Sequence, residues 1–208
     1  MPTTLPPAFR ETWRPVGTRR RRSRFALVSS VAETTLYEHG PTADALADSL
    51  TEGVVPVRSL FAIELRLTPP LPAMGIAPEA VLGMAASQVR RKVVRNVEAE
   101  GLIVGDERES GPFERADGTI GRRSVLESAV RLEPAGEDET RTIDAETHVA
   151  VWPTAESYGV AGGTLPLEAL AEFEVTLEVD PERDRETVLE FVATVVTGGE
   201  NEDGYSTR

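Results

Sequence analysis

The sequence has no cysteine, only one lysine and two histidines. The lack of cysteine excludes disulfide bonds, thiolate zinc sites and cysteine nucleophiles. His39 and His148 stand alone, without an HxH, HxxxH or HExxH spacing, so no metal site is predicted. No apolar run approaches the roughly 18 residues that a membrane-crossing helix needs, and no membrane association is expected.

Acidic residues dominate what is present. Asp and Glu number 35 against 22 basic residues, a net charge of −13, and Lys92 is the sole lysine among those 22. Carboxylates hold water and cations at high salt, while salt screens their mutual repulsion. These two skews together favour a protein of a salt-loving cell. The alternative is an acidic protein from a GC-rich genome, in which codon usage favours arginine over lysine.

Length and patterning predict one domain of 208 residues. Residues 1–23 are interpreted as an extended N-terminal arm, with Phe9 and Trp13 anchored on the domain. Residues 24–197 form the domain, and residues 198–208 are polar enough to be a disordered tail. The arginines before Phe25 loosely resemble an export signal, but the apolar segment after them is too short. A soluble, cytoplasmic protein is therefore expected.

The longest helical pattern runs over residues 76–101. Apolar residues recur there at steps of three and four, Pro78 suits the first turn, and Gly101 is suited to end the helix. Such a helix needs a broad surface to lie on, which predicts a sheet beneath its valine stripe.

Strand patterns surround this helix. Strands are predicted over 24–38 and 57–68 before it, and from 102, over 119–133, 141–152 and 157–165 after it, with a weaker edge strand over 174–179. Residues 106–118 are predicted to be a polar loop that includes the turn at Asp117-Gly118. Thr42 is expected to cap a short helix, and Asp180 a terminal one. The fold class is α+β: an antiparallel sheet of about six strands with helices packed on it.

Three segments carry a resemblance to a known fold. They are the strand from Phe61 to Pro70 that ends in a TPPL run, the helix end Glu100-Gly101-Leu102, and the pair VAVW (149–152) and GVAGG (159–163). With them the chain resembles an uncharacterised haloarchaeal domain family of the Mog1/PsbP-like fold, an α/β/α sandwich. The resemblance implies no reaction and no catalytic residues. Mog1-like members bind small GTPases and PsbP-like ones attach to photosynthetic complexes, but neither role transfers on fold alone.

No residue pattern predicts catalysis, a cofactor or a metal. The serines form no G-x-S-x-G elbow, and the glycines of 159–163 form neither G-x-G-x-x-G nor a Walker motif. Glycines in a strand more often mark a bulge or the close approach of another element. The protein is not expected to be an enzyme.

Arginine clusters are the remaining candidates for function. One contains Arg19, Arg20, Arg21, Arg22 and Arg24, and a second contains Arg90, Arg91, Lys92 and Arg95. A third, shorter pair is Arg122-Arg123. They either bind an anion or pair with this protein's own carboxylates, which the acidic composition favours. The first hypothesis is therefore a non-enzymatic interaction or scaffold domain with an unknown protein partner. The second is anion or nucleic-acid binding through these clusters. The oligomeric state stays open.

Overall fold

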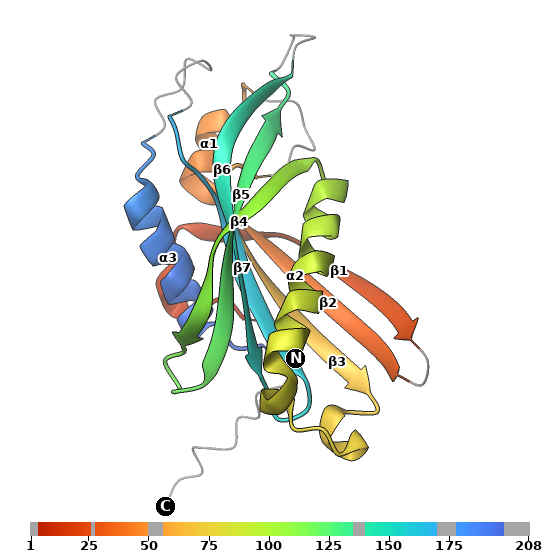
Figure 1. The fold of residues 1–208 in the computed structure, drawn as a ribbon. Coiled ribbons are helices and arrows are strands. Elements are labelled where there is room, and N and C mark those ends of the chain that lie inside the picture. The colour runs from red at the N-terminus through yellow and green to blue at the C-terminus, as the bar shows by residue number, and fades with distance from the viewer. Residues whose placement is uncertain (1–3, 26–27, 50–55, 135–139, 170–177, 198–208) are drawn as a thin grey trace, which may run out of the picture.

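A seven-stranded antiparallel sheet forms the centre of the protein (Figure 1). The computed structural model describes residues 4–25, 28–49, 56–134, 140–169 and 178–197. The strand order is β1-β2-β3-β7-β6-β5-β4. The strands are β1 (Trp13–Phe25), β2 (Val28–His39), β3 (Ser59–Thr68), β4 (Leu102–Glu114), β5 (Ile120–Leu132), β6 (Arg141–Pro153) and β7 (Tyr158–Pro166).

Two antiparallel meanders build this sheet. Strands β1, β2 and β3 form the first, β4 to β7 form the second, and β3 pairs with β7 to join them. The four-strand meander and the antiparallel α+β class are as predicted, but the strand count of about six is wrong. The seventh strand is β1, which the sequence did not reveal because Pro15 and the arginine run hide its alternation. The domain boundary predicted at residue 23 falls inside this strand.

The helices lie on both faces of the sheet (Figure 1). Helix α2 (Leu82–Ala99) follows two 3-10 turns, η2 (Leu71–Met74) and η3 (Pro78–Val81), and packs on β4, β5 and β6. Helix α3 (Pro181–Thr194) covers the opposite face over β7, and α1 (Gly40–Leu46) follows β2. Helix α2 connects the first half of the chain to the four-strand meander, as predicted, and it leads to the edge strand β4. It begins later than residue 76 because the preceding turns are 3-10. Among the described residues, no helix combines the length and apolar character needed to cross a membrane.

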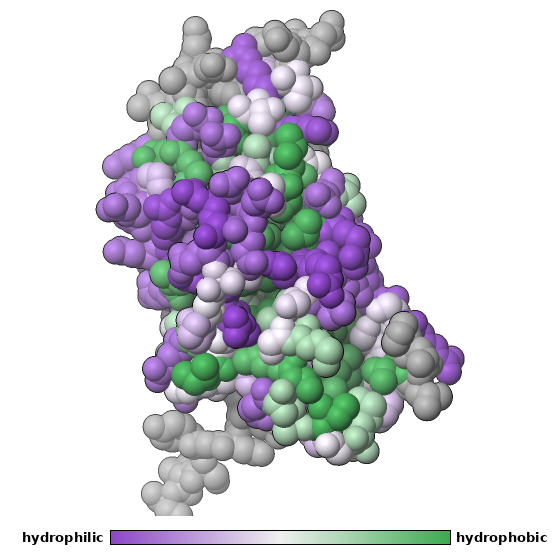
Figure 2. Space-filling model, viewed as in Figure 1, coloured by the Kyte–Doolittle hydropathy of each residue, from purple (hydrophilic) through white to green (hydrophobic). Residues whose placement is uncertain are grey.

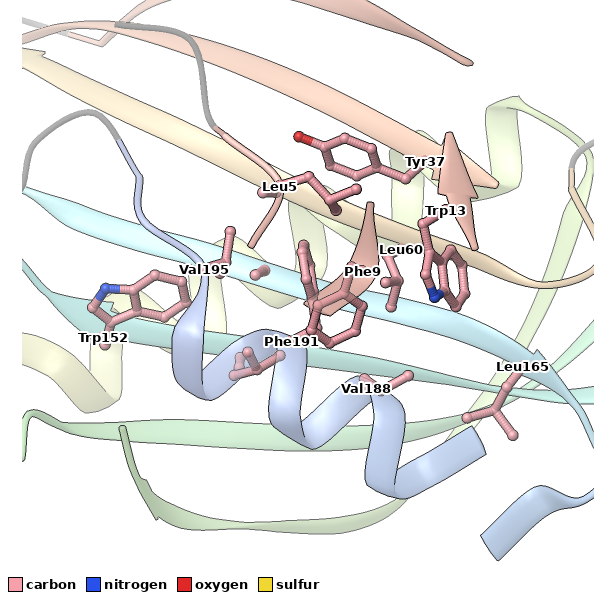
Figure 3. Packing of buried hydrophobic residues seen from close by; sticks show 14 residues of the cluster. Leu5, Phe9, Trp13, Tyr37, Leu60, Trp152, Leu165, Val188, Phe191 and Val195 are labelled. Carbon is pink, nitrogen blue, oxygen red and sulfur yellow. The ribbon is translucent and has the colours of Figure 1, made fainter. Parts of the chain in front are cut away.

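The core beneath α3 is built around Phe191, which is fully buried (Figure 3). Phe9 meets its ring edge-on at a centroid distance of 5.5 Å, and Tyr37 does so at 6.2 Å. Trp13 belongs to the same cluster. The predicted anchoring of Phe9 and Trp13 on the domain is confirmed.

The glycines of strand β7 make room for close neighbours on β6. A Cβ at Gly159 would lie 2.3 Å from the Trp152 ring, and one at Gly162 would lie 1.9 Å from the carbonyl oxygen of His148. The predicted close approach of another element at 159–163 is confirmed. Residues 159–163 are therefore part of the buried strand β7.

Several local predictions differ from the structure. His39, not Thr42, caps α1, because the His39 ring accepts a hydrogen bond from the Thr42 backbone N–H. The polar segment 106–114 is part of β4 rather than a loop, because pairing with β5 satisfies its backbone. Asp180 caps α3 as predicted. The strand predicted over 174–179 lies largely outside the described residues, and the tail 198–208 wholly so.

Candidate ligand-binding groove

A groove with a volume of about 670 Å³ lies between α2 and the strands β1, β2 and β3. We call it the α2 groove. In Figure 1 these three strands extend past α2 to one side, so the helix covers only part of their surface. The volume is within the range typical of small-molecule sites.

The floor of the α2 groove is apolar. Phe61, Ile63 and Leu65 alternate along β3 and therefore share one face, and Leu36 of β2 pairs in register with Phe61. Ile63, Leu65 and Leu36 are only partly buried although they belong to an apolar cluster. Covering such half-exposed aliphatic side chains with an apolar group removes them from water and lowers the free energy.

Helix α2 forms the wall of the α2 groove with a valine stripe. Val89, Val93 and Val97 recur every fourth residue and line the groove. Val93 is buried, whereas Val89 and Val97 are only partly buried. The space beneath this side of the helix is incompletely filled by side chains. Figure 2 shows hydrophobic residues gathered at the lower end, where η2, η3 and the first turns of α2 lie. Met84 there is 65% exposed.

Cations stand along the β1 side of the α2 groove. Arg19 and Arg21 are two residues apart and project from the same face of β1, next to Lys92 of α2. Arg19 forms an ion pair with Glu100 at the end of α2. The Lys92 ammonium donates a hydrogen bond to Ser23 Oγ at 3.2 Å. Of the nine residues in the first and second predicted arginine clusters, Arg19, Arg21 and Lys92 therefore lie together at the groove.

Two of these cations have no carboxylate partner among the described residues. The two carboxylates that line the groove are already paired, Glu100 with Arg19 and Glu38 with Arg14 Nε at 2.6 Å. Arg21 and Lys92 have no carboxylate within ion-pair distance in the described part of the chain. The rim thus presents two positive charges beside an apolar floor, in a protein that is otherwise acidic.

The other predicted arginines lie elsewhere. Strand alternation places Arg20, Arg22 and Arg24 on the opposite face of β1, where they are exposed. Arg90 pairs with Glu107, and hydrogen bonds from Arg90 and Ser124 outweigh burial and lower the pKa of that carboxyl. The remaining members of the second cluster, Arg91 and Arg95, are exposed on α2. Arg123 of the third pair forms an ion pair with Glu109. The expectation of pairing with local carboxylates therefore holds for Arg19, Arg90 and Arg123.

A second hollow, of about 470 Å³, lies between α3 and the start of α1. Burial, Arg58 and Arg183 lower the pKa of His39 there to about 4, so its ring is neutral at pH 7. Arg58 forms an ion pair with Asp184 at 2.7 Å and donates a hydrogen bond to Thr42 Oγ1 at 3.2 Å, although Arg58 Nε has no hydrogen-bond partner among the described residues. His39 Nδ1 lies 2.8 Å from the same hydroxyl. These contacts connect the start of α1 with α3 through Arg58.

A buried carboxylate on β6 also has a strongly shifted pKa. Glu146 accepts hydrogen bonds from Arg185 Nε at 2.6 Å and Nη2 at 2.9 Å, and its Oε1 lies 2.7 Å from His148 Nε2. Burial alone would raise the pKa of Glu146, but the bonds with His148 and Arg185 outweigh it and lower the pKa to about 2. Both Glu146 and His148 are 3% exposed, so this cluster fastens α3 to the sheet and offers no access to a substrate.

The sequence missed the α2 groove because each of its parts had an ordinary interpretation. The β3 alternation indicated a core-facing strand, and the α2 valines indicated a packed helix. The available signal was Asn96, a polar residue within the stripe that lines the groove. No cluster of His, Asp or Glu suited to a metal ion occurs within the described residues.

Comparison with known proteins identifies a family without a described activity. A protein-family model described as Domain of unknown function (DUF6517) matches residues 9–196. The match begins before β1 and ends after α3, so it includes the strands β1 to β7 and the helices α1, α2 and α3. Neither the curated proteins nor the solved structures contain a match to the chain.

Proposed function

Because the chain belongs to a family defined as a domain of unknown function (DUF6517), we propose its role from the α2 groove: non-enzymatic binding of an amphipathic anion. The ligand has an apolar chain that covers the β3 floor and a carboxylate or phosphate group that meets Arg21 and Lys92. The observation that carries this proposal is an open apolar groove with two cations on its rim that form no ion pair with any described residue. This proposal keeps the interaction-domain hypothesis and changes the partner from a protein to a small amphiphile.

The electrostatics support an anionic head group. A single negative charge near the rim is attracted by both Arg21 and Lys92, whereas a cation would be repelled by them. The partly buried aliphatic floor adds a favourable contribution to the binding free energy that grows with the apolar area covered, so the ligand's chain need not have one particular length. Selectivity therefore comes from the charge, and the apolar chain supplies most of the affinity.

The same geometry speaks against nucleic acid as the main ligand. Phosphates along one strand need basic side chains on one continuous surface, but β1 divides its arginines between two faces. Single strands also use exposed aromatic rings for stacking. Trp13, the aromatic residue at the start of β1, is only 7% exposed.

Calorimetric titration with dodecanoate tests the proposal. We expect saturable binding that weakens about tenfold when Arg21→Gln and Lys92→Gln are combined, because the two solvent-screened charge contacts together contribute about 1.5 kcal/mol. Dodecanol, which has the same chain without the charge, is expected to bind the native protein and the double variant equally well. A bulky change on the floor, Ile63→Trp, is expected to abolish binding of both.

A matched control uses the other face of the same strand. Arg20→Gln combined with Arg22→Gln removes the same net charge but lies outside the α2 groove. Dodecanoate affinity should be unchanged in this variant. Equal losses in both double variants would mean that only net charge matters, and the absence of saturable binding to the native protein would refute the proposal.

The setting of this function is also a proposal. The net charge of −13 and the single lysine support a salt-rich cytoplasm, in which hydrophobic contacts are stronger and charge contacts weaker. The sheet with helices on both faces supports a relationship with the Mog1/PsbP-like fold, and the three segments of resemblance lie in β3, at the end of α2 and in the β6–β7 hairpin.

A further inference from the structure

Strand β1 is an edge of the sheet. It pairs with β2 on one side, and no described residue pairs with it on the other. Alternate residues of an edge strand direct their N–H and C=O groups outward, where another strand can bind them. A bulge between Pro15 and Gly17 interrupts the register near its start, so the regular part of the edge runs from Gly17 onward.

The regular part of this edge is densely basic and exposed. Arg20, Arg22 and Arg24 project from the face opposite the α2 groove, and all three are exposed. None of them has a carboxylate within ion-pair distance in the described part of the chain. Opposite charges directly across neighbouring strands stabilise their pairing, and like charges oppose it.

We propose that β1 binds an extended acidic peptide segment of a partner protein as an eighth strand of the sheet. Carboxylates at every second position of that segment lie beside Arg20, Arg22 and Arg24, while its backbone pairs with the outward groups of β1. This inference is independent of the α2 groove, because it uses the other face and the edge of the strand.

Three other occupants fit this edge less well. A second copy of β1 would place its own arginines beside these arginines, which is unfavourable. Strand β4 of a second copy, the opposite edge of the sheet, is acidic, but its pairing register shifts on both sides of Glu107. Its Glu107 and Glu109 are already paired with Arg90 and Arg123. Nucleic acid would use the charge but leave the backbone groups unpaired.

Fluorescence anisotropy with a labelled peptide of alternating glutamate and threonine tests the proposal. We expect binding that weakens about tenfold or more in the triple variant Arg20→Ser, Arg22→Ser and Arg24→Ser, since three cross-strand charge pairs are lost together. The variant should keep the native circular dichroism spectrum and melting temperature, because these side chains are exposed. The Arg21→Gln and Lys92→Gln variant should lose much less affinity for the peptide.

Two N-methylated peptides separate strand addition from simple charge attraction. In a bound peptide strand, every second residue directs its N–H group toward β1 and the residues between them direct theirs away. Methylating the first set blocks pairing with β1, whereas methylating the second set leaves it intact. We expect one pattern to abolish binding and the other to preserve it. Equal binding of both patterns would overturn the proposal.

Two further outcomes are decisive against it. Tighter binding of a single-stranded oligonucleotide than of the peptide would assign this edge to nucleic acid. Sedimentation that showed β1-dependent self-association without peptide would assign it to a second copy of the chain.

Discussion

Replacing the buried carboxylate Glu146 with glutamine should reduce the stability of the protein in a pH-dependent manner. Glu146 is 3% exposed and holds Arg185 of α3 by two hydrogen bonds. Its pKa falls from 4.5 to about 2 on folding. Because each pH unit corresponds to about 1.4 kcal/mol, the charged form contributes about 3 kcal/mol to folding at neutral pH.

The expected cost of Glu146→Gln is somewhat smaller, about 2–3 kcal/mol at neutral pH. The Arg185 side chain is 38% exposed, so water screens its charge and solvates it when the carboxylate is lost. The folded pKa lies below the unfolded value. The contribution of Glu146 is therefore fully present above pH 4.5 and disappears as the pH falls to about 2.

Urea unfolding of both proteins across a pH series measures this contribution. Many carboxylates titrate in the same range, so the informative quantity is the difference in the free energy of unfolding between native protein and variant. We expect that difference to be constant near neutral pH and to shrink as the pH falls below 4.5. A difference that stays constant down to about pH 2 would refute the assignment of the low pKa to Glu146.

The neighbouring strand offers a matched control. Glu127 of β5 pairs in register with Glu146 but is 59% exposed, and its ion pair with Arg108 is long, at 3.8 Å. Glu127→Gln removes the same charge from the same row of the sheet. Its cost should stay within about 0.5 kcal/mol, as is usual for exposed positions.

Two further predictions concern packing and salt. Gly162→Ala should cost about 3 kcal/mol or more in urea unfolding, because its Cβ would meet the His148 carbonyl at 1.9 Å. Gly83→Ala on α2, where nothing lies within 4 Å, should instead stabilise slightly, so equal effects would contradict the packing argument. Lowering the salt concentration should reduce the melting temperature by about 5 °C or more through unscreened acidic repulsion, and an unchanged melting temperature across a salt series would contradict a halophilic origin.

Local signals accounted for most elements of the fold. The Asp180 cap, the alternation of β3 and the turn at Asp117-Gly118 depend on interactions between residues that are close in sequence. Strand β1 escaped detection because arginine occupies both faces of its central part, which removes the period-2 contrast between a core face and a solvent face.

The candidate site was predicted only in part. Arg19, Arg21 and Lys92 were among the expected binding residues and do lie together, but the sequence could not separate them from Arg20, Arg22 and Arg24. Adjacent residues of a strand project to opposite faces, so a run that looks like one cluster becomes two once its segment is a strand.

The sequence by itself determined the net negative charge, the antiparallel α+β class and the helix that crosses the sheet, because composition and periodicity carry that information locally. Only the tertiary structure decided where β1 lies, that α2 leaves a groove beside β3, and that Glu146 meets Arg185 across 39 positions of the chain. Those features depend on how distant elements pack. The free energy of such packing comes from contacts between residues that are distant in sequence, so the pattern within one segment does not reveal it.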